Sequence, residues 1–202
     1  MLGSYSMNTI KAVIFDLDGT LVKLPIDWDN VRRRVRELLK TDHPLKPLGV
    51  GVYEVTRNNP KLMAEAFKLI EFEELKAAEK TKYDSKLYEL IKNLKRLGLK
   101  LGLVTLQGVK SATIVLRKLN IIDFLDVVVT REKSVYRIEQ LKIALKKLNV
   151  KPSETLFIGD TVWDREAGDS LGCKTLIVGC DIANVVEVEG IVRKVLRSTF
   201  NP

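Results

Sequence analysis

The chain has 202 residues, of which 46% are hydrophobic and 30% are charged. This is the composition of a globular protein with one full-sized core, or with a core and a small inserted domain. No apolar run approaches ~18 residues, which excludes a membrane-spanning helix, and two cysteines are too few for a small domain held together by disulfides. The net charge of +8 fits either a solvated basic surface or the attraction of anions, whether phosphorylated metabolites or nucleic acid.

The first eight residues lack the positive start, the apolar stretch and the cleavage site of a signal peptide. We therefore expect a cytoplasmic protein, and we leave residues 1–8 out of the fold prediction.

Short apolar runs without polar alternation predict buried strands of a parallel sheet. In chain order, they are AVIF at 12–15, LKLGLVT at 99–105, VVVT at 127–130, TLFI at 155–158 and TLIV at 175–178. Apolar residues at helical spacing lie between and after these runs, in segments 87–97, 112–119, 141–148, 161–171 and 184–196. Strands that alternate with helices predict an α/β fold, a Rossmann-like parallel sheet with helices on both faces.

The stretch from about residue 24 to residue 82 breaks this rhythm, because it contains helical patterns and no convincing strand. One helix face runs from Val31 to Leu39 and a second from Met63 to Ile70, with a loop at 42–47 between them. We therefore expect an α/β core at 9–23 and 83–202 and a small helical cap at 24–82, inserted after the first strand.

Two carboxylates follow the first predicted strand, at Asp16 and Asp18. Residues i and i+2 of an extended chain point the same way, so both should project from the carboxyl edge of the sheet, where ligands bind in α/β folds. Side by side they repel each other unless a cation or a proton intervenes. The pair therefore predicts a metal, a shared proton or both, although Asp-Gly is also common in plain turns.

Three further oxygen-bearing side chains fall at the same predicted edge. Thr105 ends the second strand, Asp160 follows the fourth, and Asp164 lies in the first turn of the next helix. Oxygen donors with little His or Cys suit Mg²⁺. The structural alternatives are a sheet-end hydroxyl at Thr105 and a helix N-cap at Asp160.

Together these motifs resemble the haloacid dehalogenase superfamily, most members of which are phosphatases. The resemblance spans nearly the whole chain: DLDGTL at 16–21, the strand end LVT at 103–105 and GDTVWD at 159–164 match three family motifs. The insert after the first motif resembles the helical cap of the phosphoglycolate phosphatase-like subgroup.

The third family motif departs from the pattern. The family usually has a Lys just before the helix that ends near Leu148, and the corresponding position here is Val135. Lys133 and Arg137 lie on either side of it. We favour Arg137 as the third-motif cation, because it stands at the expected helix start, while Lys133 stays open.

The resemblance implies a hydrolase that uses Mg²⁺ to remove phosphate from a small phosphorylated metabolite, such as phosphoglycolate or a sugar phosphate. It implies that Asp16 attacks phosphorus to form an aspartyl-phosphate, that Asp18 is the general acid and base, and that Thr20 orients Asp18. The phosphate-binding residues implied are Thr105, Leu106 and Gln107 with Arg137 or Lys133. The metal ligands implied are Asp16, Asp18 and Asp160, with Asp164 supporting them.

Two other functions stay open at this point. A phosphomutase would use the same aspartates but protect the phospho-enzyme from water. A non-catalytic binding protein would use the basic surface of the same scaffold. We expect a small phosphorylated metabolite as the partner, without a membrane and without nucleic acid.

Overall fold

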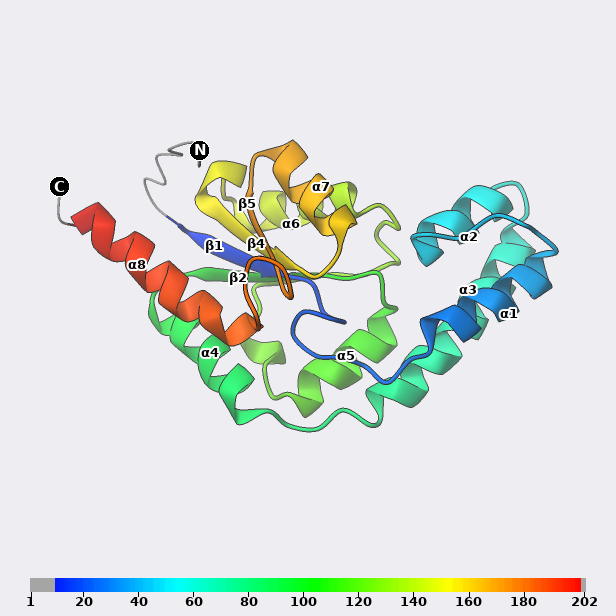
Figure 1. Ribbon diagram of the computed structural model, residues 1–202, viewed down its shortest axis with the longest axis horizontal. Coiled ribbons are helices and arrows are strands. Elements are labelled where there is room, and N and C mark those ends of the chain that lie inside the picture. Colours follow the sequence, from blue (N-terminus) through cyan, green and yellow to red (C-terminus); the bar gives the residue numbers. More distant parts are fainter. Residues whose placement is uncertain (1–9, 201–202) are drawn as a thin grey trace.

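The computed structural model describes residues 10–200 (Figure 1). The expectations about residues 1–8 lie outside this range. In the described part of the chain, no helix is long and apolar enough to cross a membrane.

The strands of residues 10–200 form one parallel sheet in the order β3-β2-β1-β4-β5. They are β1 (Ala12–Phe15), β2 (Lys100–Val104), β3 (Val127–Val129), β4 (Thr155–Gly159) and β5 (Lys174–Ile177). β1 lies in the centre, with Phe15 opposite Leu103 of β2 and Ile158 of β4. The carboxyl ends of these three strands therefore meet at one point of the sheet edge, and the predicted α/β fold is confirmed.

Helices cover both faces of the sheet. Figure 1 shows α4 (Ser85–Arg96), α5 (Val109–Lys118) and α8 (Val188–Phe200) on one side, and α6 (Arg137–Leu148) and α7 (Val162–Leu171) on the other. Short 3-10 turns lie at Ile122–Phe124, Pro152–Glu154 and Val185–Glu187.

The alternation of side chains along β1 divides the core in two. Val13 and Phe15 pack into the cluster under α4, α5 and α8, whereas Ala12 and Ile14 pack into the cluster under α6 and α7. All four are fully buried, which explains why the run has no polar alternation.

The ends of α7 follow the predicted signals. The Thr161 side chain accepts a hydrogen bond from the Asp164 N–H, and Gly172 ends the helix with φ +82°, a backbone angle that suits glycine. The last helix differs from its prediction at 184–196, because a 3-10 turn comes first and α8 begins at Val188.

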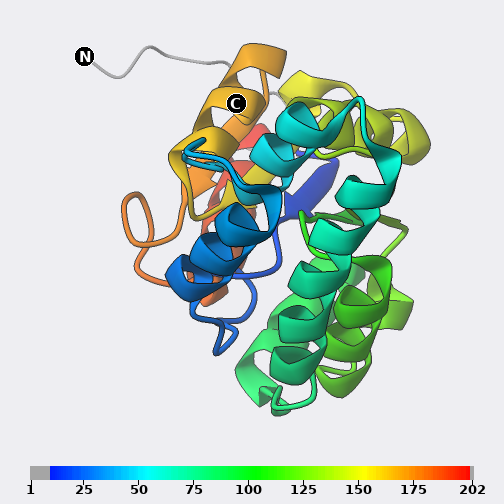
Figure 2. The same cartoon turned by 90° about the vertical axis from the view of Figure 1, so that its right-hand side faces the viewer.

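The insert consists of α1 (Trp28–Leu39), α2 (Leu48–Thr56) and α3 (Pro60–Ala78). Figure 2 looks onto these helices, which lie in front of the sheet. They share a hydrophobic cluster of their own, built around Val35, Val52 and Ile70. This cluster supports the division of the chain into a core and a cap at 24–82, which stays a prediction.

Sequence analysis missed α2. Its sequence, LGVGVYEVT, carries two glycines, which disfavour helix by about 1 kcal/mol each. Gly51 is there because of close packing: a Cβ at this position would lie 2.6 Å from the Leu45 Cα. Tertiary contact thus stabilises a helix whose local sequence does not predict it.

We expect Phe157→Ala to destabilise the fold by about 3–5 kcal/mol. Phe157 of β4 is fully buried, so its truncation leaves a cavity under α6 and α7. Phe72→Ala is the control, since Phe72 is 58% exposed, and should change stability by no more than about 0.5 kcal/mol. Urea denaturation measures both, and equal effects would contradict this description of the core.

Candidate active site

Asp16 lies at the centre of the carboxyl edge of the sheet. It follows β1 directly, its N–H donates to the Ile158 carbonyl at 2.9 Å, and the residue is only 4% exposed. The backbone ladder with β4 therefore holds this carboxylate in place.

The turn after Asp16 brings a second loop close. Gly19 has φ +87°, and a Cβ there would lie 2.0 Å from Oδ2 of Asp160. Only glycine allows both the left-handed backbone and this approach. The Asp-Gly of the first motif is thus a turn, and it also makes room for the carboxylate that follows β4.

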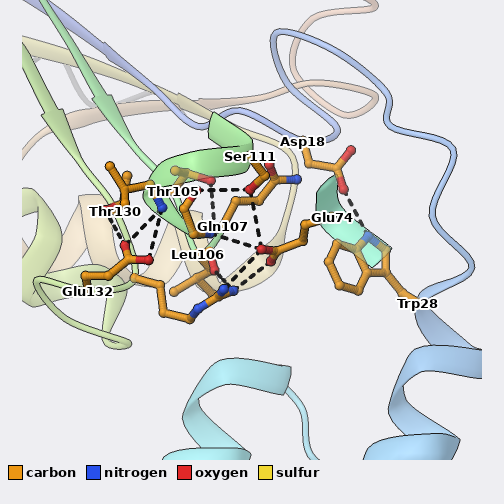
Figure 3. Close-up of polar contacts among 12 residues, drawn as sticks. Asp18, Trp28, Glu74, Thr105, Leu106, Gln107, Ser111, Thr130 and Glu132 are labelled. Carbon is orange, nitrogen blue, oxygen red and sulfur yellow. Dashed lines mark hydrogen bonds and ion pairs between the residues drawn. The ribbon is translucent and has the colours of Figure 1, made fainter. Parts of the chain in front are cut away.

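The Asp18 carboxylate is fixed by the chain that leads into the cap. Its Oδ1 accepts from the Leu24 N–H at 2.8 Å and its Oδ2 from the Trp28 Nε1–H at 2.9 Å (Figure 3). Burial raises the pKa of Asp18, and the bonds from Leu24 and Trp28 oppose this rise. A raised pKa favours the protonated form that a general acid requires.

Arg137, the first residue of α6, bridges two carboxylates. Its Nη2 lies 2.6 Å from Oδ1 of Asp16, and its Nε lies 2.7 Å from Oδ1 of Asp164. Its Nη1 donates to Oε1 of Gln140 at 3.0 Å. Lys133, in contrast, is exposed and lines a separate cavity. Of the two third-motif candidates, Arg137 is therefore the one that the fold places beside Asp16.

Asp164 stabilises the loop after β4 through hydrogen bonds with Thr161. It is fully buried, and its Oδ2 accepts from the Thr161 Oγ1 at 2.6 Å and from the Thr161 N–H at 3.1 Å. A Cβ on Gly159 would lie 2.4 Å from the Asp164 Cβ, so this packing requires glycine. Both carboxylate oxygens of Asp164 are thus engaged by protein groups, which suits the supporting role expected of it.

Negative charge is crowded at this edge. Burial raises the pKa of Asp16 to about 8, against the opposing effect of Arg137 and with additional repulsion from Asp164 and Asp160. Burial and the neighbouring Asp164 and Asp18 raise the pKa of Asp160 to about 6. The pKa of Arg137 is also raised: burial lowers it, but the attraction of Asp16 and Asp164 outweighs burial.

This donor set fits a hard divalent cation. No three His, Cys, Asp or Glu side chains of residues 10–200 are grouped as metal ligands, but Mg²⁺ commonly uses one or two carboxylates and completes its shell with other oxygens. Asp16 and Asp160, which both line the cavity described below, supply two such carboxylates. The raised pKa values of both carboxylates show that added positive charge would stabilise their ionised forms.

The loop between β2 and α5 (residues 105–108, called the β2–α5 loop below) carries Thr105, which is buried. Its Oγ1 accepts from the Gln107 N–H at 3.2 Å, which leaves its hydroxyl hydrogen available. The Thr105 carbonyl accepts from Gln140 Nε2 at 2.7 Å. Gln107 is 3% exposed, and neither polar atom of its side chain has a partner among the described residues.

A cavity of about 890 Å³ lies between this edge and the cap. The predicted site residues that line it are Asp16, Asp18, Thr105, Leu106, Gln107, Arg137 and Asp160. Thr20 does not line it; its buried hydroxyl has no hydrogen-bond partner in the described chain, so its role in orienting Asp18 stays a prediction.

Sequence analysis missed several residues that shape this cavity. From the cap, Trp28, Arg32 and Glu74 line it, and Arg131 lines it from the core. None of them stands in a motif. A buried polar residue such as Glu74 carries no local signal, because its partners lie far along the chain.

The buried carboxylate predicts how stability depends on pH. Without metal, Asp16 binds its proton more tightly in the folded chain, where its pKa is about 8, than in the unfolded chain at 3.8. Its contribution to folding stability is therefore lost as the pH rises between these values. Relative to Asp16→Asn, we expect wild type to lose about 4 kcal/mol between about pH 5 and about pH 8.

Urea denaturation in EDTA at both pH values measures this difference. Asp42→Asn is the control, because Asp42 is exposed on the cap, and it should follow wild type. A gap between wild type and Asp16→Asn that does not change with pH would contradict the raised pKa.

Comparisons with known proteins agree with this geometry. The family model of haloacid dehalogenase-like hydrolases matches residues 13–178. A pyrophosphatase PpaX of Bacillus cereus is 29% identical over 181 residues, which cover 84% of this chain and 83% of that protein. A Saccharomyces cerevisiae protein described as an uncharacterized hydrolase is 29% identical over 180 residues, or 87% of this chain and 80% of that protein.

Among solved structures, CbbY from Rhodobacter sphaeroides in complex with phosphate has a TM-score of 0.61 at 17% identity, covering 84% of this chain and 86% of that one. This likeness shows the fold. The match of the family model over most of the chain shows more, and it confirms the resemblance found in the sequence: the chain belongs to the haloacid dehalogenase-like hydrolases.

Proposed function

We propose that the chain is a Mg²⁺-dependent phosphatase that removes phosphate from a small phosphorylated metabolite through an aspartyl-phosphate. One observation carries this proposal. In a haloacid dehalogenase-like hydrolase, the buried Asp16 lies at a cavity between core and cap and is held at 2.6 Å by the guanidinium of Arg137.

Asp16 is the proposed nucleophile. Arg137 holds its Oδ1, which leaves Oδ2 to attack phosphorus in line with the leaving oxygen. The attack needs the ionised carboxylate, and the positive charge of Arg137 favours that form. When bound by Asp16, Asp160 and the Asp18 carbonyl, with Asp164 in support, Mg²⁺ would offset the negative charge that nucleophile and phosphate share.

Asp18 is the proposed general acid and base. Its raised pKa keeps a proton available for the departing alkoxide, and the resulting carboxylate then takes a proton from the water that attacks the phospho-enzyme. The bonds from Leu24 and Trp28 limit the rise in pKa, so that the same group can serve in both steps.

Thr105 and the β2–α5 loop are proposed to hold the phosphate oxygens. The Thr105 Oγ1 accepts from Gln107, so its own hydrogen can be donated to a phosphate oxygen, together with the backbone N–H of Leu106. The N–H groups of Gly108 and Val109 are already bonded to Glu74 and Glu132. The groups left to bind phosphate are therefore those at the start of the loop, Thr105 and Leu106.

Hydrolysis of p-nitrophenyl phosphate by the purified chain tests the proposal. We expect turnover with Mg²⁺, its loss in EDTA, and a loss of at least about a thousandfold in Asp16→Asn. Asp42→Asn should retain wild-type activity, because Asp42 lies in an exposed loop of the cap. Turnover that persists in EDTA or in Asp16→Asn would contradict the mechanism.

A panel of phosphoglycolate, sugar monophosphates and pyrophosphate then defines the substrate; pyrophosphate is included because of the names of the relatives. A phosphomutase would instead transfer phosphate to a sugar monophosphate after activation by a bisphosphate, and would release little free phosphate.

We expect Trp28→Phe to move the alkaline limb of the pH profile of kcat/KM to higher pH by about one unit. The hydrogen bond from Trp28 lowers the pKa of Asp18, so without it the acid stays protonated at higher pH. Trp163→Phe is the matched control, because Trp163 also lines the cavity and is 40% exposed. A shift to lower pH, or the same shift in both variants, would overturn this assignment of Asp18.

A further inference from the structure

A buried ion pair joins the cap to the core beside the cavity. Glu74 of α3 meets Arg131, which follows β3, through two contacts: Nη1 to Oε1 at 2.6 Å and Nη2 to Oε2 at 3.0 Å. The side chains are 1% and 8% exposed. The Arg131 guanidinium also lies 5.1 Å from the centre of the Phe67 ring of α3, so this cap helix contacts it twice.

The same two side chains bind the backbone of the β2–α5 loop, and Figure 3 shows Glu74 beside Leu106 and Gln107 of this loop. Arg131 Nη1 donates to the Leu106 carbonyl at 2.9 Å, and Glu74 Oε2 accepts from the Gly108 N–H at 3.1 Å. A Cβ on Gly108 would lie 2.9 Å from Arg131 Nη2 and 3.4 Å from Glu74 Oε2. Glycine at 108 is therefore what allows the ion pair to sit against the loop.

Three successive peptide groups of this loop are held by buried side chains. Gln140 binds the Thr105 carbonyl, Arg131 binds the Leu106 carbonyl, and Glu74 binds the Gly108 N–H. Gln140 and Arg131 belong to the core, whereas Glu74 comes from the cap. The cap thus contributes directly to the backbone conformation at the start of α5.

Joining the two parts of the molecule would not require this arrangement. A buried ion pair adds little stability compared with apolar packing, and other ion pairs already link α3 to α5 at the surface, such as Glu71 with Lys110. What distinguishes Glu74 and Arg131 is their contact with the loop backbone. Hydrogen bonds from charged groups fix geometry strongly, and a small displacement of a binding group has a large effect on rate.

We propose that Glu74 and Arg131 are positioning residues through which cap helix α3 sets the phosphate-binding conformation of the β2–α5 loop. This rests on the proposed function in so far as the loop holds phosphate. The ion pair makes phosphate affinity depend on the position of the cap, because the pair holds the backbone of the loop that is proposed to bind phosphate.

The test compares Glu74→Gln with Glu71→Gln, a matched control one turn earlier on the same helix face. Calorimetry with inorganic phosphate and Mg²⁺ gives the affinity, and hydrogen exchange of the backbone amides gives the order of residues 105–111. In Glu74→Gln we expect phosphate affinity to fall at least about tenfold and exchange at 105–111 to accelerate. Glu71→Gln should stay within about twofold of wild type, and with p-nitrophenyl phosphate the loss in Glu74→Gln should appear mainly in KM.

Arg131→Lys provides a second variant, which replaces Glu74→Gln if circular dichroism shows that Glu74→Gln does not fold. It keeps the charge but lacks the forked group that reaches both Glu74 and Leu106, and a partial loss of phosphate affinity is expected. Unchanged affinity in a folded Glu74→Gln or Arg131→Lys would overturn the proposal even if exchange accelerates, because the pair would then be merely structural. An equal loss in Glu71→Gln would overturn it as well.

Failure of the proposed function would look different. A wild-type chain that binds no phosphate would count against the phosphatase. Hydrogen exchange would then still test whether Glu74 orders the loop backbone. Acceleration confined to residues 105–111 in Glu74→Gln supports this effect of Glu74, and unchanged exchange overturns it.

Discussion

The chain of ion pairs from Asp16 through Arg137 to Asp164 is the interaction on which the site depends. It joins the end of β1, the start of α6 and the first turn of α7 through one guanidinium, with contacts of 2.6 and 2.7 Å. Two buried carboxylates without such a partner would repel each other and resist ionisation. Burial and the neighbouring carboxylates still raise the pKa values of Asp16 and Asp160, so the guanidinium of Arg137 offsets only part of the negative charge, and the proposed Mg²⁺ would offset more of it.

Two glycines allow the carboxylates to approach this closely. The absence of a side chain at Gly19 leaves room for Asp160, and its absence at Gly159 leaves room for Asp164. A Cβ at these positions would lie 2.0 and 2.4 Å from the two aspartate side chains. The glycines of the first and fourth motifs therefore serve the packing of acidic groups as well as the turns. In the sequence these glycines look like ordinary turn residues, but in the structure they are required because a side chain would clash.

The cap contacts the candidate active site at two separate places. Trp28, at the start of α1, donates to the carboxylate of Asp18, and Glu74, near the end of α3, binds the backbone at Gly108. One contact bears on the proposed acid and the other on the proposed phosphate loop. Since both ends of the insert engage the core beside the cavity, the seating of the cap and the geometry of the site are physically linked.

The sequence by itself determined the strands, the ends of α7, the placement of Asp16, Asp18, Thr105 and Asp160 at one sheet edge, and the family, because short-range signals encode them: apolar runs, caps and motif spacing. The sequence favoured Arg137 over Lys133 because Arg137 stands at the expected helix start, but only the packing of α6 against the sheet shows that Arg137 reaches Asp16. Tertiary packing also stabilises α2, whose two glycines disfavour a helix. The ion pair of Glu74 with Arg131 was likewise not predictable, because the two residues lie 57 positions apart in the chain. Long-range partners leave no local pattern, so burial and charge become readable only once the chain is folded.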